Sequence, residues 1–473
     1  MYNIQTSRNL KGLVTIWGSK NAGLPLLAAA LLIDWEITLH NVPDIADIHD
    51  FLHFYASLWA SYSFKNNTLK LSTHHISLEN IDTSSIARTR AGIYFMAGLL
   101  SRFWEARLPY PSWDKIGARP IDEHINGYKT MWYEMTDSKS EIIFFWKWSS
   151  DDVTLTAYFA VTATANLIMW AVSRSWITTI ELAAFEPHIF NLIDFLRAAW
   201  VHIEVRYDHT IIIHWGNSLS SEIEYEVISD YLQSGTFAII WALCAETYID
   251  IHRARIIDLW AFLYKLHEAW VKTENLWDDT LRVYRAEKLK AVDIQTNIFP
   301  GFPTDLMPLF SVLMTQCEGT SRIHEILYEW RLNWLVEYER LWCSPRIINL
   351  HEAKIEWPSQ LIGARVNSWD LRSWAAMVIA GLIAEGETVI ENIYWIHRGY
   401  DDFIGKLKSL GAKIEEVRYY YDIYYKKDLH KSWSYIIYVL VIWNFTLSTY
   451  DSLTKKFNLH FDAKIYAPSF SIT

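Results

Sequence analysis

The segment from Leu108 to Pro120 (LPYPSWDKIGARP) carries residues whose types and spacing suit acid–base chemistry. Asp114, Lys115 and Arg119 lie within six residues, so a carboxyl group that can donate a proton stands beside two cations that can hold an anion. The prolines in its first half remove backbone donors and predict a loop rather than a helix or a central strand. Taken alone, such a segment would also fit a solvated surface turn.

Further charged groups stand at the ends of predicted elements. Lys20 lies in the strand–turn–helix stretch 11–32, where the helix N-terminus favours an anion beside its ammonium group. Asp305 follows Thr304 in the segment 293–306, and either side chain could instead cap the helix predicted to follow. Arginines open further loops or helices in SSIARTR, DLRSWA and HRGY. The sequence contains neither a phosphate loop of the GxxxxGK[ST] kind nor a GxGxxG motif.

The elements that must position these groups recur along the chain. A phrase made of an apolar helix end, one small or aromatic residue and an alternating strand occurs six times, about every 70 residues. The key positions of the six copies are Trp59, Trp132, Trp200, Trp270, Trp342 and Gly411. Each unit reads as strand, loop, amphipathic helix, tight helix stop and strand, which predicts an α/β protein of repeated units.

The helix stops carry an unusual residue type. A residue at such a stop commonly adopts the left-handed conformation, which is free of strain for glycine but costs other residues about 1–2 kcal/mol. Only the sixth copy has glycine, and the chain contains 25 tryptophans against 17 glycines. We hypothesise that many of these tryptophans stand for glycine in the native protein, as happens when a lineage reads the UGA codon as glycine. The alternative is a tryptophan-rich core.

Composition excludes several classes of protein. At 473 residues the chain is too long for one core, so we expect two domains. A net charge of −11 argues against a nucleic-acid-binding surface. The N-terminus lacks the apolar stretch of a secretory signal, and the apolar run 435–443 is about half as long as a membrane span. Cys244, Cys317 and Cys343 fit neither a disulfide framework nor a zinc motif, which predicts a cytoplasmic protein.

Six motifs, taken together, resemble those of the UDP-N-acetylglucosamine 1-carboxyvinyltransferase family in their order and separations. They are SKNAGLP, IGARP, FPTD, DLR, AGLIAEG and HRGY. The resemblance covers about residues 4–418. It implies two similar domains, each an inside-out α/β barrel of three repeats, and therefore six pseudo-repeats of about 70 residues. The domains would comprise residues 20–228, which contain the catalytic loop 108–120, and residues 1–19 plus 229–418. Residues 419–473 would form an extension of unknown role.

The resemblance also implies a reaction. The enolpyruvyl group of phosphoenolpyruvate would pass to the 3′-hydroxyl of UDP-N-acetylglucosamine through a tetrahedral intermediate, with release of phosphate. This is the first committed step of peptidoglycan synthesis and serves cell-wall formation, cell shape and division. The chemistry needs a base for the hydroxyl, an acid for the methylene carbon and cations for a phosphate and a carboxylate. No metal or organic cofactor is implied, no membrane span or nucleic-acid partner is expected, and a monomer is expected rather than an oligomer.

Each motif receives a role from the resemblance. Asp305 matches the carboxylate near the attacking hydroxyl, and Asp114 matches the proton donor of the loop; with Lys20 and Arg398 they form the catalytic set. The clamp on phosphoenolpyruvate is matched by Lys20, Arg119 and Arg398, with Arg331 and Arg372 as supporters. The nucleotide-sugar site is matched by Asn21, Arg90, Arg119, Pro120, Ile121, Asp122, Glu123, Tyr158, Phe159, Ala160, Val161 and Leu327.

Some positions depart from the family pattern. Many members have cysteine where Asp114 stands, although some have aspartate, which can donate a proton where its environment raises its pKa. The aspartate lacks the soft nucleophile that fosfomycin alkylates, so the chain is expected to be insensitive to this epoxide. Ala160 replaces a usual serine, while Tyr231 and Gln233 replace a common arginine and glutamate.

Other functions stay open at the level of sequence. The same fold serves an enolpyruvyl transferase that acts on shikimate 3-phosphate, although IGARP and FPTD favour the nucleotide-sugar enzyme. A non-catalytic nucleotide-sugar-binding homologue is a further alternative if the tryptophans are literal and block the loops. A metal site at His202 and Glu204, or at His74 and His75, is disfavoured because these residues fit a strand and a surface turn.

Overall fold

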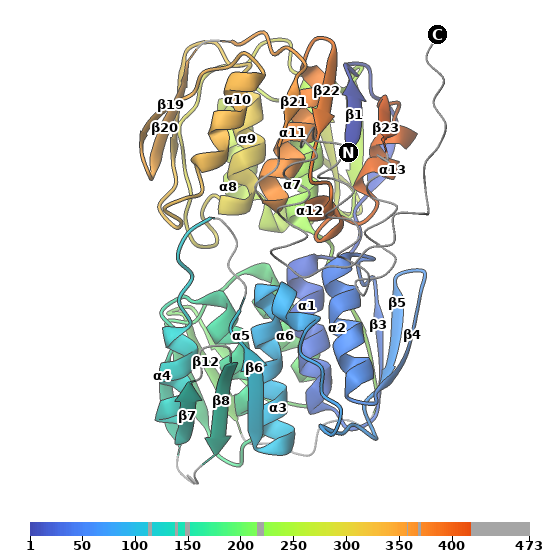
Figure 1. Ribbon diagram of the computed structural model, residues 1–473. Coiled ribbons are helices and arrows are strands. Elements are labelled where there is room, and N and C mark those ends of the chain that lie inside the picture. The colour runs from blue at the N-terminus through green and yellow to red at the C-terminus, as the bar shows by residue number, and fades with distance from the viewer. Residues whose placement is uncertain are drawn as a thin grey trace, which may run out of the picture. The chain divides into compact units, whose positions relative to one another are not determined.

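The computed structural model describes residues 1–111, 116–137, 141–146, 152–214, 222–356, 358–367 and 370–417 (Figure 1). The candidate proton donor Asp114 and the C-terminal extension 419–473 lie outside these residues. The described residues build two hydrophobic cores. We call the cluster drawn from residues 22–227 the first core, and the cluster drawn from residues 2–16 and 231–414 the second core.

Three sheets belong to the first core among the described residues. In spatial order their strands are β13 (Glu222–Glu226), β3 (Glu36–His40), β5 (Thr68–Ser72) and β4 (Ser61–Lys65); β6 (Glu105–Pro109), β8 (Glu141–Trp146) and β7 (Tyr133–Asp137); and β11 (His202–Arg206), β12 (Thr210–His214), β10 (Thr178–Glu181) and β9 (Val153–Thr156). Alternation gives each sheet an apolar face. In β5, for example, Leu69 and Leu71 are buried while Lys70 between them is exposed.

Three further sheets belong to the second core within the described part of the chain. Their strands are β15 (Thr273–Leu276), β16 (Thr280–Tyr284), β14 (Tyr248–His252) and β2 (Leu13–Thr15); β17 (Ile294–Gln295), β18 (Thr320–His324), β20 (Glu352–Glu356) and β19 (Arg346–Asn349); and β21 (Arg365–Val366), β22 (Glu387–Ile390), β1 (Tyr2–Gln5) and β23 (Ile414–Glu416). The N-terminal strands β1 and β2 therefore pair with strands that follow them by hundreds of residues.

The innermost helices are buried on all sides and are mostly apolar. In the second core, α7 (Tyr231–Cys244), α9 (Met307–Met314) and α11 (Leu371–Ile383) pack on one another (Figure 1). Nearly every side chain of these three helices is buried. The helices of the first core are α1 (Lys20–Ala29), α2 (Ala46–Ser57), α3 (Phe95–Phe103), α4 (Asp122–Thr130), α5 (Val161–Ala171) and α6 (Pro187–Ala198). Those of the second core are α7 (Tyr231–Cys244), α8 (Trp260–Glu268), α9 (Met307–Met314), α10 (Glu337–Arg340), α11 (Leu371–Ile383), α12 (Tyr394–His397) and α13 (Phe403–Ser409).

Short 3-10 helices complete the elements: η1 (Ala30–Leu32), η2 (Ile86–Arg88), η3 (Arg90–Tyr94), η4 (Ile256–Asp258), η5 (Thr304–Leu306) and η6 (Asn333–Val336). In the described part of the chain, no helix combines the length and the apolar character needed to cross a membrane. Buried helices covered by sheets, around two cores, confirm the predicted α/β class. The 70-residue repeat itself stays a prediction.

The chain crosses from one core to the other twice, and the two crossing segments pair with each other. Gly18 bridges Ser229, and the Ser19 N–H donates to the Ile228 carbonyl over 2.8 Å. A Cβ atom at Gly18 would meet a backbone carbonyl oxygen at 1.7 Å, so only glycine fits there. Helix α1 begins at Lys20 directly after the first crossing, which places this lysine at the junction of the two cores.

The six predicted helix stops are confirmed. Helices α2, α4, α6, α8, α10 and α13 each end just before a stop residue, and a strand follows. The φ angles there are 67° at Trp59, 65° at Trp132, 71° at Trp200, 68° at Trp270, 65° at Trp342 and 104° at Gly411. The five indoles are 58–74% exposed, so none of them packs in a core. Trp104, with φ 62° at the end of α3, adds a stop that the repeat did not predict.

Two local predictions need correction. Strand β6 extends to Pro109, so the first residues of the predicted loop are strand, at the edge of a sheet where proline is tolerated. Neither Thr304 nor Asp305 caps a helix, because the N-cap residues of η5 and α9 are Pro303 and Leu306. The Asp305 carboxylate is therefore available for other partners.

Candidate active site

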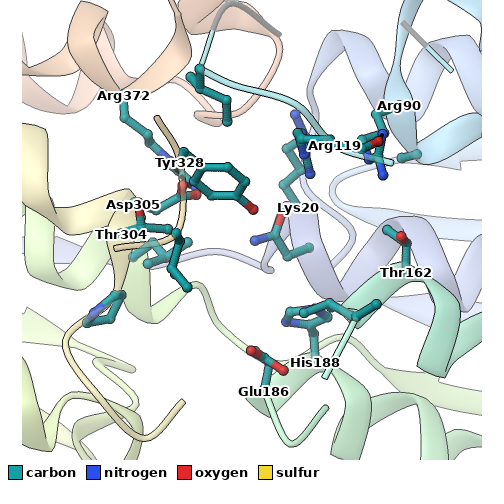
Figure 2. Close-up of a pocket in the computed structure, with 18 of the residues that line it drawn as sticks. Lys20, Arg90, Arg119, Thr162, Glu186, His188, Thr304, Asp305, Tyr328 and Arg372 are labelled. Carbon is teal, nitrogen blue, oxygen red and sulfur yellow. Dashed lines mark hydrogen bonds and ion pairs between the residues drawn. The ribbon is translucent and has the colours of Figure 1, made fainter. Parts of the chain in front are cut away.

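A cavity of about 510 Å³ is lined by residues of both cores (Figure 2). Its lining includes six cations, Lys20, Arg90, Arg119, Arg331, Arg372 and Arg398. It also includes four carboxyl groups, Glu123, Glu186, Asp305 and Asp370. The cavity of an acidic protein thus has an excess of cations, which suits an anionic ligand.

The partly exposed carboxylate of Asp305 binds two buried arginines. Its Oδ1 accepts from Arg331 Nη2 at 2.9 Å and its Oδ2 from Arg372 Nε at 3.0 Å. Burial alone would raise the pKa of Asp305, but Arg372 and Arg331 outweigh burial and lower it far below its usual value. The motif DLRS fixes Arg372, because Asp370 caps α11 by accepting the N–H groups of Arg372 and Ser373 at 2.8 and 3.1 Å.

Asp47, in the first turn of α2, joins two of the predicted substrate cations. Its side chain is fully buried, with Oδ2 2.7 Å from Lys20 Nζ and Oδ1 2.8 Å from Arg398 Nε. The Thr89 hydroxyl donates to Oδ2 at 3.2 Å. Burial opposes ionisation of Asp47, but Lys20 and Arg398 prevail and lower its pKa. One carboxylate therefore holds together a lysine of the first core and an arginine of the second.

The described end of the predicted loop Leu108–Pro120 is tied to a segment of the second half of the chain. The Ala118 N–H donates to Glu329 Oε1 at 2.8 Å, and the Trp330 N–H donates to the Ile116 carbonyl at 3.0 Å. The pKa of Glu329 is lowered, chiefly because its carboxylate accepts this hydrogen bond from the Ala118 N–H. These contacts place residues 116–120 against the segment that carries Arg331.

Arg90 and Arg119 shape the same loop. Arg90 Nη2 donates to the Pro120 carbonyl at 3.0 Å, and Nη1 donates to the Arg119 carbonyl. The Arg119 guanidinium lies 5.7 Å from the centre of the Tyr328 ring, within range of a cation–π interaction. Arg90, predicted as a ligand contact, thus orients the backbone of the loop as well as lining the cavity.

The cavity brings together most of the predicted site residues. Those in its lining are Lys20, Asn21, Arg90, Arg119, Pro120, Glu123, Phe159, Ala160, Val161, Asp305, Leu327, Arg331, Arg372 and Arg398. The lining does not include Ile121, Asp122 or Tyr158. Tyr231, one of the departures from the family pattern, lines the cavity, and Asp114 lies outside the described residues.

Sequence reasoning missed Asp47, Glu186 and His188. Each stands between a strand and the next helix or in the first turn of that helix, so a polar residue there reads as an ordinary helix start. An acidic residue in such a loop, in a chain with several arginines at loop ends, could have indicated a site residue.

Glu186 and His188 lie together at one end of the cavity (Figure 2). Burial raises the pKa of Glu186 to about 7, although hydrogen bonds from its own N–H and from the Phe299 N–H oppose the shift. Its Oε2 is buried and has no hydrogen-bond partner among the described residues. Burial also lowers the pKa of His188 to about 4, so its imidazole is neutral at physiological pH.

The raised pKa of Glu186 predicts a pH-dependent stability. The folded protein keeps this proton up to about pH 7, whereas the unfolded chain loses it near pH 4.5, so the group destabilises the fold progressively as pH rises between these values. The full penalty above pH 7 is about 3 kcal/mol. We expect Glu186→Gln to raise the free energy of urea unfolding at pH 8 by about 1–3 kcal/mol and to leave it unchanged near pH 4.5.

The exposed Glu79 offers a matched control for that measurement, and Glu79→Gln should not change stability at either pH. A Glu186→Gln effect of equal size at pH 4.5 and pH 8 would contradict the argument, because only ionisation of Glu186 separates the two conditions.

Solved structures identify the class of fold. The crystal structure of the enolpyruvyl transferase NikO from Streptomyces tendae matches with a TM-score of 0.79 at 19% identity, covering 88% of this chain and 98% of that chain. An EPSP synthase from Acinetobacter baumannii matches with a TM-score of 0.68 at 14% identity, covering 88% and 99%. The fold is therefore that of the enolpyruvyl transferases.

Sequence comparison then gives the family. The family described as EPSP synthase (3-phosphoshikimate 1-carboxyvinyltransferase) matches residues 4–407. UDP-N-acetylglucosamine 1-carboxyvinyltransferase 3 of Caldanaerobacter subterraneus subsp. tengcongensis is 35% identical over 421 residues, 88% of this chain and 99% of that protein. The UDP-N-acetylglucosamine 1-carboxyvinyltransferase of Halothermothrix orenii is 34% identical over 417 residues, 88% and 99%. The chain belongs to the enolpyruvyl transferase family, as its motifs predicted.

Proposed function

We propose that this protein transfers the enolpyruvyl group of phosphoenolpyruvate to the 3′-hydroxyl of UDP-N-acetylglucosamine and releases phosphate, the first committed step of peptidoglycan synthesis. The observation that carries the proposal is the cavity, in which cations from both cores surround the ionised carboxylate of Asp305. The two relatives described above match this chain over 99% of their own length, and both are named as UDP-N-acetylglucosamine 1-carboxyvinyltransferases. This favours the nucleotide sugar over shikimate 3-phosphate as the acceptor.

In this proposal the cations bind phosphoenolpyruvate. Lys20, Arg119 and Arg398 hold its phosphate and carboxylate, because they reach the cavity from both cores and carry the complementary charge. Arg331 and Arg372 support the site by holding Asp305 in place. The nucleotide sugar lies along the wall formed by Asn21, the loop 119–123 and the turn before α5, where Ala160 offers no hydroxyl group.

Asp305 receives the proton of the acceptor hydroxyl. Its lowered pKa makes it a weak base in the free protein, but the negative charge of bound phosphoenolpyruvate offsets Arg331 and Arg372 and so raises its basicity. The hydroxyl oxygen bonds to C2 of phosphoenolpyruvate while Asp114 donates a proton to the methylene carbon. Loss of a proton from the resulting methyl group and departure of phosphate then restore the double bond.

The organisation of the chain is part of the proposal. We assign residues 20–228 to one domain and residues 1–19 plus 229–418 to the other, with support from the two cores and the paired crossings. We place the enzyme in the cytoplasm as a monomer. The three cysteines, which are buried and free, support a reducing compartment.

A phosphate-release assay tests the activity. The purified protein should release phosphate when phosphoenolpyruvate and UDP-N-acetylglucosamine are both present, and should not do so with either substrate alone. Release that requires shikimate 3-phosphate would identify the other transferase of this fold. Nucleotide-sugar binding without phosphate release under any combination would instead indicate a binding homologue.

We predict that fosfomycin does not inactivate the enzyme over time, because the Asp114 carboxylate is a poor nucleophile for the epoxide compared with a thiolate. Residual activity after prolonged incubation should match that of an untreated sample. The cysteines offer no substitute target, since all three are buried and burial raises the pKa of Cys244 and Cys317 to about 12. Asp114→Cys should gain time-dependent inactivation, whereas covalent loss of activity in the unaltered enzyme would contradict the prediction.

A further inference from the structure

His202, Glu204 and His214 lie on one face of the sheet formed by β11, β12, β10 and β9. His202 and His214 are direct partners across the antiparallel pair β11–β12, and Glu204 follows His202 by two residues on the same strand. Because side chains alternate along a strand, all three share a face. None of them lines the cavity described above, so they belong to a separate part of the first core.

The three side chains converge. The imidazole rings of His202 and His214 stack with centroids 4.4 Å apart and an angle of 17° between their planes. Glu204 Oε1 lies 3.0 Å from His214 Nε2. One ligand atom from each residue lies within 4.8 Å of the other two, and no other group of three such side chains among the described residues meets that condition.

We propose that His202, Glu204 and His214 bind one divalent transition-metal ion, with Zn²⁺ as the model ligand. Two imidazole nitrogens and one carboxylate oxygen form a donor set that zinc accepts, with water completing the coordination, whereas calcium and magnesium prefer oxygen donors alone. Metal binding requires the side chains to rotate from their present stacked arrangement, and it exchanges the Glu204–His214 hydrogen bond for two bonds to the metal.

The position of the site suggests its effect. Strand β11 is at the edge of its sheet and pairs only with β12 among the described strands. A metal held by His202 and Glu204 on β11 and by His214 on β12 would fasten this edge. Binding to the folded protein alone raises its stability in proportion to the logarithm of the metal concentration.

His74 and His75 form a second pair of neighbouring histidines, but the charges around this pair differ from those around the proposed site. Their rings lie 4.3 Å apart, and Asp34 Oδ1 is 3.6 Å from His74 Nδ1. That carboxylate oxygen, however, is already bonded to Arg102. An arginine neighbour opposes a second cation, so this pair serves as a control that also has two histidines beside a carboxylate.

Zinc titration of the full-length protein against a chromophoric chelator tests the proposal. We expect one high-affinity Zn²⁺ per chain, a loss of affinity of roughly tenfold or more in His202→Ala, His214→Ala and Glu204→Gln, and no change in a His74→Ala/His75→Ala variant. Zinc should also raise the melting temperature of the unaltered protein and of the control variant, but not that of the three site variants.

His202 and Glu204 are exposed, so their replacement should not unfold the protein, and lost binding cannot be ascribed to misfolding. The transferase activity of these variants should equal that of the unaltered enzyme. Failure of the unaltered protein to bind stoichiometric zinc at micromolar concentrations would overturn the proposal. So would equal affinity in His202→Ala, or loss of binding in the His74→Ala/His75→Ala variant.

Discussion

Replacing Asp305 with asparagine should lower kcat for phosphate release by about 10²–10⁴-fold without raising the KM for phosphoenolpyruvate. The amide keeps the size of the carboxylate but cannot accept the proton of the attacking hydroxyl. It also removes the charge that occupies Arg331 and Arg372, so these guanidinium groups attract an anion at least as strongly as before. A fall in kcat with unchanged KM indicates loss of an interaction that acts in the transition state.

The matched control for this variant is Asp278→Asn, at an exposed turn with φ 60°, where asparagine is well tolerated. It should retain unaltered kcat and KM. Circular dichroism should show that the Asp305→Asn protein is folded, because one amide oxygen can still accept a hydrogen bond from the buried arginines. A variant with unaltered kcat would exclude Asp305 as the base.

Replacing the five stop tryptophans with glycine should stabilise the protein by about 1 kcal/mol per site, or about 5 kcal/mol for all five. Each of these residues has a left-handed backbone conformation, and each indole is exposed. Packing of the side chain therefore does not offset the backbone strain. The greater entropy of glycine in the unfolded chain reduces the gain at every site. The positions are far apart in the sequence and share no described partner, so their effects should add in guanidinium unfolding.

Alanine distinguishes backbone strain from the indole itself. Trp59→Ala keeps the Cβ atom that the left-handed conformation disfavours, and it should gain much less stability than Trp59→Gly. At the sixth stop the sign reverses, so Gly411→Ala should destabilise the protein by about 1 kcal/mol, because φ there is 104°. Equal effects of alanine and glycine at Trp59 would show that strain is not the cause.

The hypothesis of glycine recoding concerns more than the helix stops. Trp241 and Trp374 are fully buried in α7 and α11, and the Nε1 atom of each has no partner among the described residues. A buried N–H group without a partner costs about 1–3 kcal/mol. Left-handed exposed tryptophans and unpaired buried ones are both what misread glycine codons would produce. Mass spectrometry of the native protein decides the question, since intact indoles at Trp59, Trp200 and Trp342 would exclude recoding.

The features that the sequence predicted well are those with local causes. The helix stops follow from the reversal of the chain within a few residues, so φ at Trp59 could be predicted without knowing what packs around it. Lys20 was placed correctly at the start of a helix because the turn before it is short and polar. The motif order also sufficed for the family, since each motif is a contiguous string.

The partners of the charged groups have distant causes and were missed. Arg372, which holds Asp305, is 67 residues away from it, and Arg398 meets Asp47 across 351 residues. Nothing near Asp47 in the sequence separates it from an ordinary helix-start acid. Glu186 likewise has a distant partner, because one of the hydrogen bonds that oppose its raised pKa comes from the Phe299 N–H.

The buried carboxylate of Asp47 is the counter-ion of two cations that line the cavity, Lys20 and Arg398. The single negative charge of Asp47 offsets part of the positive charge of Lys20 and Arg398, so an incoming anion meets cations that are already partly neutralised. Substrate affinity should therefore depend on ionic strength less steeply than six lining cations would suggest. Because Lys20 and Arg398 come from different ends of the chain and share Asp47, an anion that attracts both of them would weaken a contact between the two cores.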